Sequence, residues 1–193
     1  MKFPKKKIII LGGCGYIGTI LSKYLLDKGY YIKVIDRQIY GNFIKKSQNI
    51  HIVNKDVRKI THKDFTGYEY IIHLANIAND PSVELQPSLS WDINVLATDI
   101  ICKAAIKAKV KKIVFASSGS VYGIKKEKNV IEDLELKPIS VYNKTKMIAE
   151  RILLSYKKDI DIVIIRPATV CGVSERLRLD VSVNMLTYQA YKK

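Results

Sequence analysis

The chain has 193 residues, enough for one ordinary domain that buries roughly 70% of the surface exposed by an unfolded chain. Its 48% hydrophobic and 26% charged residues are typical of a globular protein and exclude disordered and fibrous classes. The net charge of +15 would suit a polyanionic partner, but the lysines are scattered along the whole chain apart from the run at 5–7. We therefore expect a solvated charged surface and no nucleic-acid partner.

The amino end places basic residues before a short apolar run at 8–11, which stops at a glycine pair. A signal peptide needs an apolar run of ~7–15 residues, and a membrane span needs about 18. We therefore expect a cytoplasmic protein with no membrane partner. The three cysteines, Cys14, Cys102 and Cys171, lie far apart and form neither a disulfide framework nor a CxxC metal pattern, so we expect reduced thiols and no metal site.

Apolar, β-rich segments alternate with helical patterns along the chain. Strands are expected at 8–11, 31–35, 50–53, 70–74, 113–116 and 162–165. Helices are expected at 16–28, 88–109 and 141–157, with a short turn near 62–65 and a last helix within 180–193. Because the strands are continuous apolar runs between helices, the pattern predicts an α/β fold of Rossmann type, a doubly wound parallel sheet with helices on both faces.

A glycine-rich loop follows the first strand directly and opens the first helix. Its glycines Gly12, Gly15 and Gly18 are spaced three apart: the first permits a tight turn, the second lets a pyrophosphate approach, and the third lets the helix pack closely on the strand. The helix N-terminus offers free N–H groups and a partial positive charge to an anion. Strand, loop and helix in this order predict a dinucleotide site, with Tyr16 and Ile17 among its contacts.

Acidic residues after the next two strands bear on the choice of cofactor. Asp36 follows the loop by about 20 residues, where a carboxylate accepts hydrogen bonds from the adenosine ribose and repels a 2′-phosphate. We therefore expect NAD, and the neighbouring Arg37 leaves NADP as the alternative. Asp56 and Val57 follow the third strand and are expected at the adenine edge, with a solvated turn as the alternative.

Tyr142 and Lys146 are four residues apart in the helix expected at 141–157 and so share one helix face. A phenol with an ordinary pKa near ~10 is a poor base at neutral pH, and a neighbouring ammonium favours the phenolate. On its own such a pair is common on amphipathic helices. Ser117 and Ser118, however, follow the fifth strand at the carboxyl edge, where open α/β sheets bind ligands.

Glycine loop, serine pair and Tyr-xxx-Lys together resemble the extended short-chain dehydrogenase/reductases, which include NAD-dependent sugar-nucleotide epimerases and dehydratases. The resemblance covers nearly the whole chain. It implies hydride transfer between NAD and a nucleotide-sugar substrate. In this family pattern Ser118 holds the reacting hydroxyl, Tyr142 removes its proton, and Lys146 holds the nicotinamide ribose and lowers the pKa of the tyrosine.

The resemblance also implies cofactor contacts from segments that follow other strands. The expected contacts are Leu74, Ala75, Asn76, Asn94, Ser117 and Pro167. Asn76 departs from the family, which has a small residue there. For Asn94 the alternative is an ordinary asparagine on a helix surface.

Arg176, Arg178 and Asn184 lie beyond the sixth strand, where related proteins contact the phosphates of the substrate. Guanidinium groups match phosphate oxygens, and plain surface charge is the alternative. We divide the chain into an NAD(P)-binding domain, 1–180, and the start of a substrate-binding region, 181–193. Family members usually continue well past this point, so we expect a truncated chain with apolar surface where the absent lobe would pack. We also expect a homodimer through the helices at 88–109 and 141–157.

Dehydratases of this family carry an Asp-Glu pair directly after the catalytic serine or threonine, where this chain has Gly119 and Ser120. The local sequence is closer to that of 4-epimerases and simple reductases. We therefore predict an NAD-dependent sugar-nucleotide epimerase or oxidoreductase. The alternatives are a catalytically inactive NAD-binding fragment without the substrate lobe and, from net charge alone, a nucleic-acid-binding scaffold.

Overall fold

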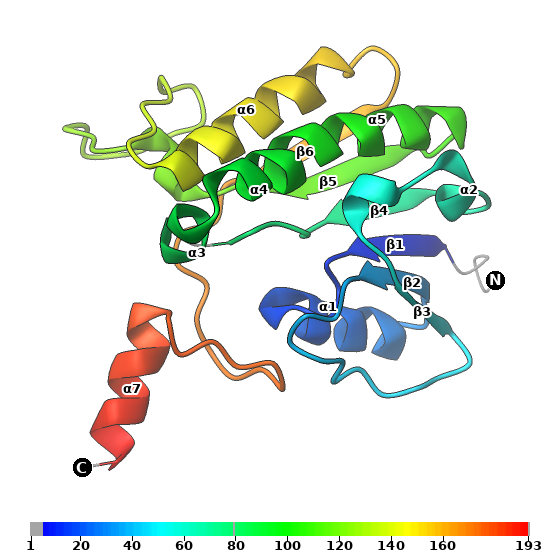
Figure 1. Ribbon diagram of the computed structural model, residues 1–193, viewed down its shortest axis with the longest axis horizontal. Coiled ribbons are helices and arrows are strands. Elements are labelled where there is room, and N and C mark those ends of the chain that lie inside the picture. Colours follow the sequence, from blue (N-terminus) through cyan, green and yellow to red (C-terminus); the bar gives the residue numbers. More distant parts are fainter. Residues whose placement is uncertain (1–5, 79, 193) are drawn as a thin grey trace.

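Six strands form one parallel sheet in the computed structural model, which describes residues 6–78 and 80–192 (Figure 1). The strands are β1 (Lys7–Leu11), β2 (Tyr31–Asp36), β3 (Ile50–Asn54), β4 (Tyr70–His73), β5 (Lys112–Ala116) and β6 (Asp161–Ile165). Every expected strand is confirmed, and its ends lie within one residue of the prediction. The order β3-β2-β1-β4-β5-β6 reverses the direction of winding between β1 and β4, and open sheets bind their ligands at such a point.

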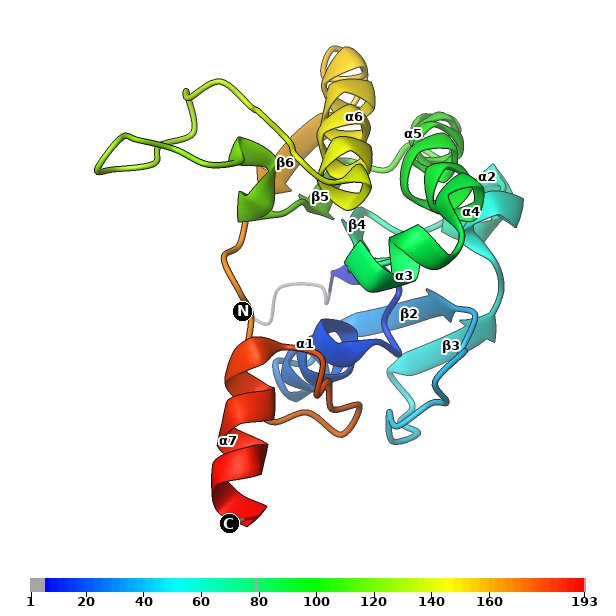
Figure 2. The ribbon, with the colours of Figure 1, turned by 60° about the vertical axis from the view of Figure 1, so that its left-hand side comes forward.

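Helices cover both faces of the sheet, as predicted. In Figures 1 and 2, α1 (Tyr16–Asp27) lies on one face, while α5 (Ala97–Lys107) and α6 (Val141–Ser155) lie on the other. The other helical segments are α2 (His62–Phe65), α3 (Asp80–Leu85), α4 (Pro87–Trp91), α7 (Ser182–Lys192) and 3₁₀ turns at Val57–Lys59 and Gly119–Tyr122. Among the described residues, no helix combines the length and apolar character that crossing a membrane requires.

The long helix expected at 88–109 is interrupted in the structure. α4 begins at Pro87, whose missing N–H suits the first position of a helix. The chain then forms a π turn at Asp92–Leu96 before α5 begins. Side-chain periodicity does not reveal this interruption, because one π turn only shifts the phase of the buried face.

Two apolar clusters fill the space above and below the sheet. Ile9 and Leu11 point into the larger cluster together with Ile101 of α5 and Leu153 of α6. Ile8 and Ile10 point to the opposite face, where partly buried leucines of α1 pack against them. β1 is therefore covered on both faces, which explains its uninterrupted apolar sequence.

Apolar side chains remain exposed at the β6 edge and on α7. Val163 and Ile165 of β6 are 38% and 51% exposed, and α7 buries none of its residues. In Figure 2, α7 stands away from the sheet. This agrees with the apolar surface expected near the carboxyl end; of the helix expected within 180–193, residue 193 lies outside the described residues.

Candidate active site

A cleft of about 760 Å³ lies at the carboxyl ends of the strands, between the two halves of the sheet. It is lined by segments that follow all six strands, together with the first turn of α6 and the chain beyond β6. The predicted site residues that line it are Gly12, Gly15, Tyr16, Ile17, Gly18, Asp36, Arg37, Asp56, Val57, Leu74, Ala75, Asn76, Ser117, Ser118, Tyr142, Lys146, Pro167, Arg176 and Arg178. Residues far apart in the sequence thus meet in one place. Two other predicted site residues, Asn94 and Asn184, are not among the described residues that line the cleft.

The glycine loop brings backbone, rather than side chains, to the floor of the cleft. Gly12 has φ +80°, and a Cβ there would lie 2.6 Å from the backbone nitrogen of Ala75. A Cβ at Gly18 would lie 2.5 Å from the carbonyl oxygen of Gly12, so both positions need glycine. α1 then starts at Tyr16 without a side-chain cap, which leaves its first N–H groups to face an anion.

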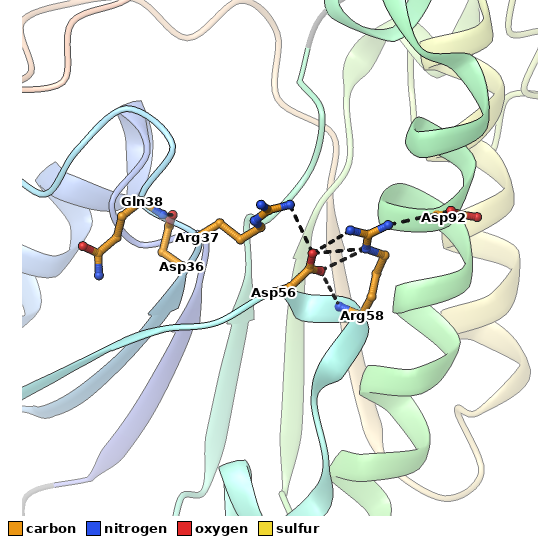
Figure 3. Close-up of polar contacts among 6 residues, drawn as sticks. All are labelled: Asp36, Arg37, Gln38, Asp56, Arg58 and Asp92. Carbon is orange, nitrogen blue, oxygen red and sulfur yellow. Dashed lines mark hydrogen bonds and ion pairs between the residues drawn. The ribbon is translucent and has the colours of Figure 1, made fainter.

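At the adenosine end of the cleft, Asp36 and Arg37 point to different partners (Figure 3). The Asp36 carboxylate accepts hydrogen bonds from the backbone N–H groups of Cys14 (3.0 Å) and Gln38 (2.6 Å). Arg37 instead extends to Asp56, with 3.3 Å between its guanidinium nitrogen and the carboxylate. Arg37, which left NADP as the alternative, is therefore paired with Asp56. Asp36, which favoured NAD, is held at the end of β2 by two backbone N–H groups.

Asp56 sits between two arginines in the same view (Figure 3). Arg58 donates to it at 2.7 Å and also lies 3.8 Å from Asp92. The hydrogen bond from Arg58 is the main reason that the pKa of Asp56 lies below its ordinary value. The solvated turn considered for this position is wrong, because Asp56 has 9% of its side chain exposed and two guanidinium partners.

Tyr142 and Ser118 meet at the far end of the cleft. Ser140 caps α6 by accepting a hydrogen bond from the backbone N–H of Asn143, which sets Tyr142 in the first turn. The Ser118 hydroxyl lies 2.7 Å from the Ser120 hydroxyl, which donates to the Asn143 side chain. Burial raises the pKa of Tyr142, while Arg178 and a hydrogen bond from Ser118 lower it.

Lys146 is buried beneath Tyr142 and is held by groups of β5. Its ammonium donates to the carbonyl oxygen of Ala116 and lies 4.3 Å from the centre of the Phe115 ring. Burial lowers the pKa of Lys146 to about 7, and the Glu150 carboxylate opposes that shift. The Arg178 guanidinium acts to lower the pKa of Tyr142, whereas the Lys146 ammonium donates to the end of β5; that Lys146 lowers the pKa of Tyr142 stays a prediction.

Glu150 is a buried acid that the sequence interpretation missed. It is 1% exposed, accepts a hydrogen bond from the Ser117 hydroxyl and pairs with Arg166 at 2.8 Å. Arg166 also donates to the Tyr122 hydroxyl at 2.8 Å. The signal was present in the sequence, because Glu150 follows Lys146 by one helical turn on the same face. The pair ties α6 to the ends of β5 and β6, which carry the predicted site residues.

Asn94 lies in the π turn and is 0% exposed, so the interpretation as a helix-surface asparagine is wrong. Its amide oxygen accepts from the backbone N–H of Ile77 (2.8 Å), and its nitrogen donates to the Ile77 carbonyl and the Thr145 hydroxyl (both 3.1 Å). The amide is thus used to hold the loop after β4 against α6. Asn94 does not line the cleft itself, but Ile77, which it binds, does.

Asn76 is the departure from the family pattern, and its amide has free hydrogen-bonding capacity. Within the part of the chain that the structure describes, neither its oxygen nor its nitrogen has a hydrogen-bond partner, although both are buried. Asn76 lines the cleft next to Ala75, which packs on Gly12. A buried polar group without a partner is costly, so the site fits a polar ligand that supplies one.

Comparison with known proteins agrees with this geometry. The model of the "NAD dependent epimerase/dehydratase family" matches residues 8–188. UDP-glucose 4-epimerase of Bacillus subtilis is 34% identical over 166 residues, which cover 76% of this chain and 46% of that protein. The chain spans about half the length of the curated relatives it matches.

Solved structures of nucleotide-sugar enzymes superpose on the chain. UDP-glucuronic acid 4-epimerase from Bacillus cereus in complex with NAD has a TM-score of 0.83 at 29% identity, covering 96% of this chain and 63% of that one. TunA, an NAD-dependent NDP-hexosamine 5,6-dehydratase, has a TM-score of 0.88 at 26% identity, covering 98% and 62%. With its glycine loop, its serine pair and its Tyr-xxx-Lys helix around one cleft, the chain belongs to the NAD dependent epimerase/dehydratase family, within the extended short-chain dehydrogenase/reductases.

Proposed function

We propose that this chain carries the catalytic half of an NAD-dependent sugar-nucleotide 4-epimerase. The observation that supports this most directly is that Ser118, Tyr142 and Lys146 line the same cleft as the glycine loop and Asp36. The 4-epimerases among its relatives add to the argument. A reductase that uses the same residues and releases its product is the neighbouring alternative.

The residues of the cleft suit NAD. The uncapped N-terminus of α1 would hold the pyrophosphate, and Asp36 would accept from the adenosine ribose. The unpartnered amide of Asn76 and the lysine ammonium of Lys146 would hold the cofactor nearer its reactive end. We expect NADP to bind more weakly, because Asp36 would repel its 2′-phosphate while Arg37 is occupied by Asp56.

Proton transfer falls to Tyr142 in this proposal. Ser118 holds the sugar hydroxyl by a hydrogen bond, and Tyr142 as phenolate takes the hydroxyl proton as the carbon loses its hydride. NAD, when bound, supplies the acceptor for that hydride and can return it. Tyr142 then returns the proton to the sugar oxygen, so the catalytic cycle of the epimerase ends with no net oxidation of the sugar. Burial raises the pKa of Tyr142, so a cation favours the phenolate, and Arg178, itself paired with Asp180 at 2.6 Å, acts in that direction.

The geometry after Ser118 argues against a dehydratase. Gly119 donates its N–H to the Pro167 carbonyl at 2.8 Å, and a Cβ at Gly119 would lie 3.2 Å from that same oxygen. An aspartate there would require the Pro167 carbonyl to shift by a few tenths of an ångström. Ser120 is tied to Ser118 and Asn143, so neither position offers the additional acid and base that elimination of water requires.

A second candidate is a chain that binds NAD without turnover. The observation that favours it is the open side of the cleft: the segment at 168–173 is exposed, and α7 buries none of its residues. Water that enters through the open side would slow hydride transfer. A sugar in the cleft would also lack contacts on that side.

The test measures binding of NAD and NADP by calorimetry, followed by turnover of UDP-, GDP- and dTDP-sugars by the chain and by its Tyr142→Phe variant. We expect NAD to bind more tightly than NADP and turnover to fall about 10²-fold or more in the variant. Binding of NAD without turnover would favour the second candidate. If NAD does not bind, the cofactor assignment is wrong.

A further inference from the structure

The segment from Gly172 to Asn184 crosses to α1, where Tyr16 binds it through both its side chain and its backbone. The Tyr16 hydroxyl donates to the Gly172 carbonyl at 2.6 Å and accepts from the Asn184 amide at 3.1 Å. At the same residue, the Ser174 hydroxyl donates to the backbone carbonyl of Tyr16 at 3.0 Å. Three hydrogen bonds from three points of the segment therefore converge on Tyr16.

The bond from Ser174 is buried and the two bonds of the Tyr16 hydroxyl are partly buried, although most of the segment is exposed. Tyr16 is 9% exposed and Ser174 is 6% exposed, whereas Val173 between the two attachment points is 93% exposed. Asn184 closes the segment on itself by accepting from the Gly172 N–H and donating to the Arg178 carbonyl, both at 2.9 Å. Loss of the Tyr16 hydroxyl would leave the Gly172 carbonyl and one Asn184 N–H without their partner.

Tyr16 is also the first residue of α1 and directly follows Gly15 of the phosphate loop. Its backbone thus belongs to the proposed cofactor site, while its side chain holds the segment that carries Arg176 and Arg178. Both arginines line the cleft. Arg176 has a second contact with the cofactor side, because its guanidinium lies 3.9 Å from the centre of the Tyr40 ring in the loop after β2.

We propose that Tyr16 is a positioning residue that couples the two halves of the cleft, so that NAD and a nucleoside diphosphate strengthen each other's binding. This rests on the proposed function, because it takes NAD as the ligand of the glycine loop. NAD bound at the N-terminus of α1 restrains Tyr16, and Tyr16 then orders the segment before the diphosphate arrives. Ordering in advance lowers the entropic cost of the second binding step, and linkage makes the effect reciprocal.

The test uses UDP as the probe, with its dissociation constant measured by calorimetry in the absence and presence of saturating NAD. Tyr16→Phe is compared with Tyr24→Phe, a matched control on the same helix whose side chain is 56% exposed. We expect NAD to tighten UDP binding about five-fold or more in the unaltered chain and in the control, and less than about two-fold in Tyr16→Phe. The affinity for NAD itself should stay within about two-fold of the unaltered chain in the Tyr24→Phe control, and NAD is kept saturating for each variant at its own measured affinity.

Hydrogen exchange of the peptide 172–184 gives a readout that needs no turnover. NAD should slow exchange there in the unaltered chain and not in Tyr16→Phe. If Tyr16→Phe fails to fold, Ser174→Ala removes one of the three hydrogen bonds and should show part of the loss. Coupling of the same size in Tyr16→Phe would overturn the inference while leaving the proposed function intact, as would NAD binding that leaves UDP affinity unchanged in the unaltered chain. Failure of NAD to bind the unaltered chain would overturn both.

Discussion

Three segments of the proposed active site meet at the Glu150 carboxylate: the end of β5 through Ser117, the end of β6 through Arg166, and α6 itself. Glu150 touches none of the atoms at which chemistry is proposed. Its hydrogen bonds instead attach the ends of β5 and β6 to the helix that carries Tyr142 and Lys146. At the scale of residues, the buried Glu150–Arg166 pair supports the positions of the proposed site residues without contacting a substrate itself.

Removing Glu150 should therefore destabilise the fold more than removing an exposed acid. We expect Glu150→Ala to lower the free energy of unfolding by about 3 to 5 kcal/mol, because Arg166 would keep a partly buried charge without its partner. Glu135→Ala is the matched control, since Glu135 pairs with Lys137 at 3.1 Å with side-chain exposures of 74% and 63%. Its cost should be about 1 kcal/mol or less. Urea unfolding measures both, and equal costs would contradict the role given to Glu150.

The buried Lys146 predicts a dependence of stability on pH. Its pKa is about 7 in the folded chain and about 10.4 in an unfolded chain. Between these values the unfolded chain binds more protons, so stability rises with pH, and the gain is lost as pH falls through the folded pKa. We expect the free energy of unfolding to increase by about 1 kcal/mol from pH 7.5 to 8.5.

The Lys146 prediction is checked by urea unfolding across that interval in the unaltered chain and in two variants. Lys146→Met should remove the increase, whereas Lys144→Met, an exposed lysine of the same helix, should keep it. Cys14 and Cys102 have pKa values raised to about 12 by burial and act in the opposite direction at higher pH, so the interval ends at 8.5. A profile for Lys146→Met that matches the unaltered chain would refute the assignment.

At the scale of elements, the π turn between α4 and α5 is the feature that most affects the cleft. It turns Asn94 inward, where the amide binds the backbone of Ile77 on both its N–H and its carbonyl. The same asparagine contacts Thr145 of α6, so one side chain joins the loop after β4 to the π turn and to α6. π turns of this kind occur frequently at functional sites.

We expect Asn94→Ala to cost about 3 kcal/mol, because it removes three hydrogen bonds of a fully buried amide and takes the side-chain partner from both the N–H and the carbonyl of Ile77. Exchange of backbone amides at 74–78 should become faster, since that loop loses its attachment to the π turn. Asn129→Ala, at an exposed position, should change neither quantity. Urea unfolding and hydrogen exchange measure the two effects, and unaltered exchange at 74–78 would argue against this role for Asn94.

At the scale of the whole molecule, several surfaces of the described residues expose apolar side chains, and two of them bear on how copies of the chain associate. One is formed by the outer sides of the segments at 88–109 and 141–157, where Leu96 and Leu154 are 58% and 42% exposed. The other is the β6 edge with Val163 and Ile165, which point away from α5 and α6. We propose the homodimer through the first surface, in line with the family resemblance.

Leu154→Glu should convert this dimer into a monomer, because two copies of the charge would face each other across a two-fold interface. Ile165→Thr lies on the opposite face of the sheet and should leave the dimer intact while reducing non-specific association. Sedimentation equilibrium distinguishes these outcomes. A dimer that survives Leu154→Glu and dissociates with Ile165→Thr would move the interface to the β6 edge.

The sequence by itself determined the strands, the parallel sheet, the glycine-rich loop and, through the family resemblance, the grouping of Ser118, Tyr142 and Lys146 around one cleft. These features follow from local physics: continuous apolar runs, glycine spacing, and a four-residue step on a helix all act between residues close in the chain. Even Gly12 and Gly18, whose need for glycine arises from close backbone approaches, are recognisable because the motif repeats at fixed spacing.

Only the tertiary structure decided which partners the polar groups take. That Arg37 pairs with Asp56, that Lys146 turns to Ala116 while Arg178 acts on Tyr142, and that Asn94 holds Ile77 depends on segments brought together by the sheet. The same holds for Tyr16 and Gly172, which are 156 residues apart. Hydrogen bonds and ion pairs are short-ranged and directional, so a pattern along the chain predicts that a group is polar and near the cleft, whereas the folded geometry selects its partner.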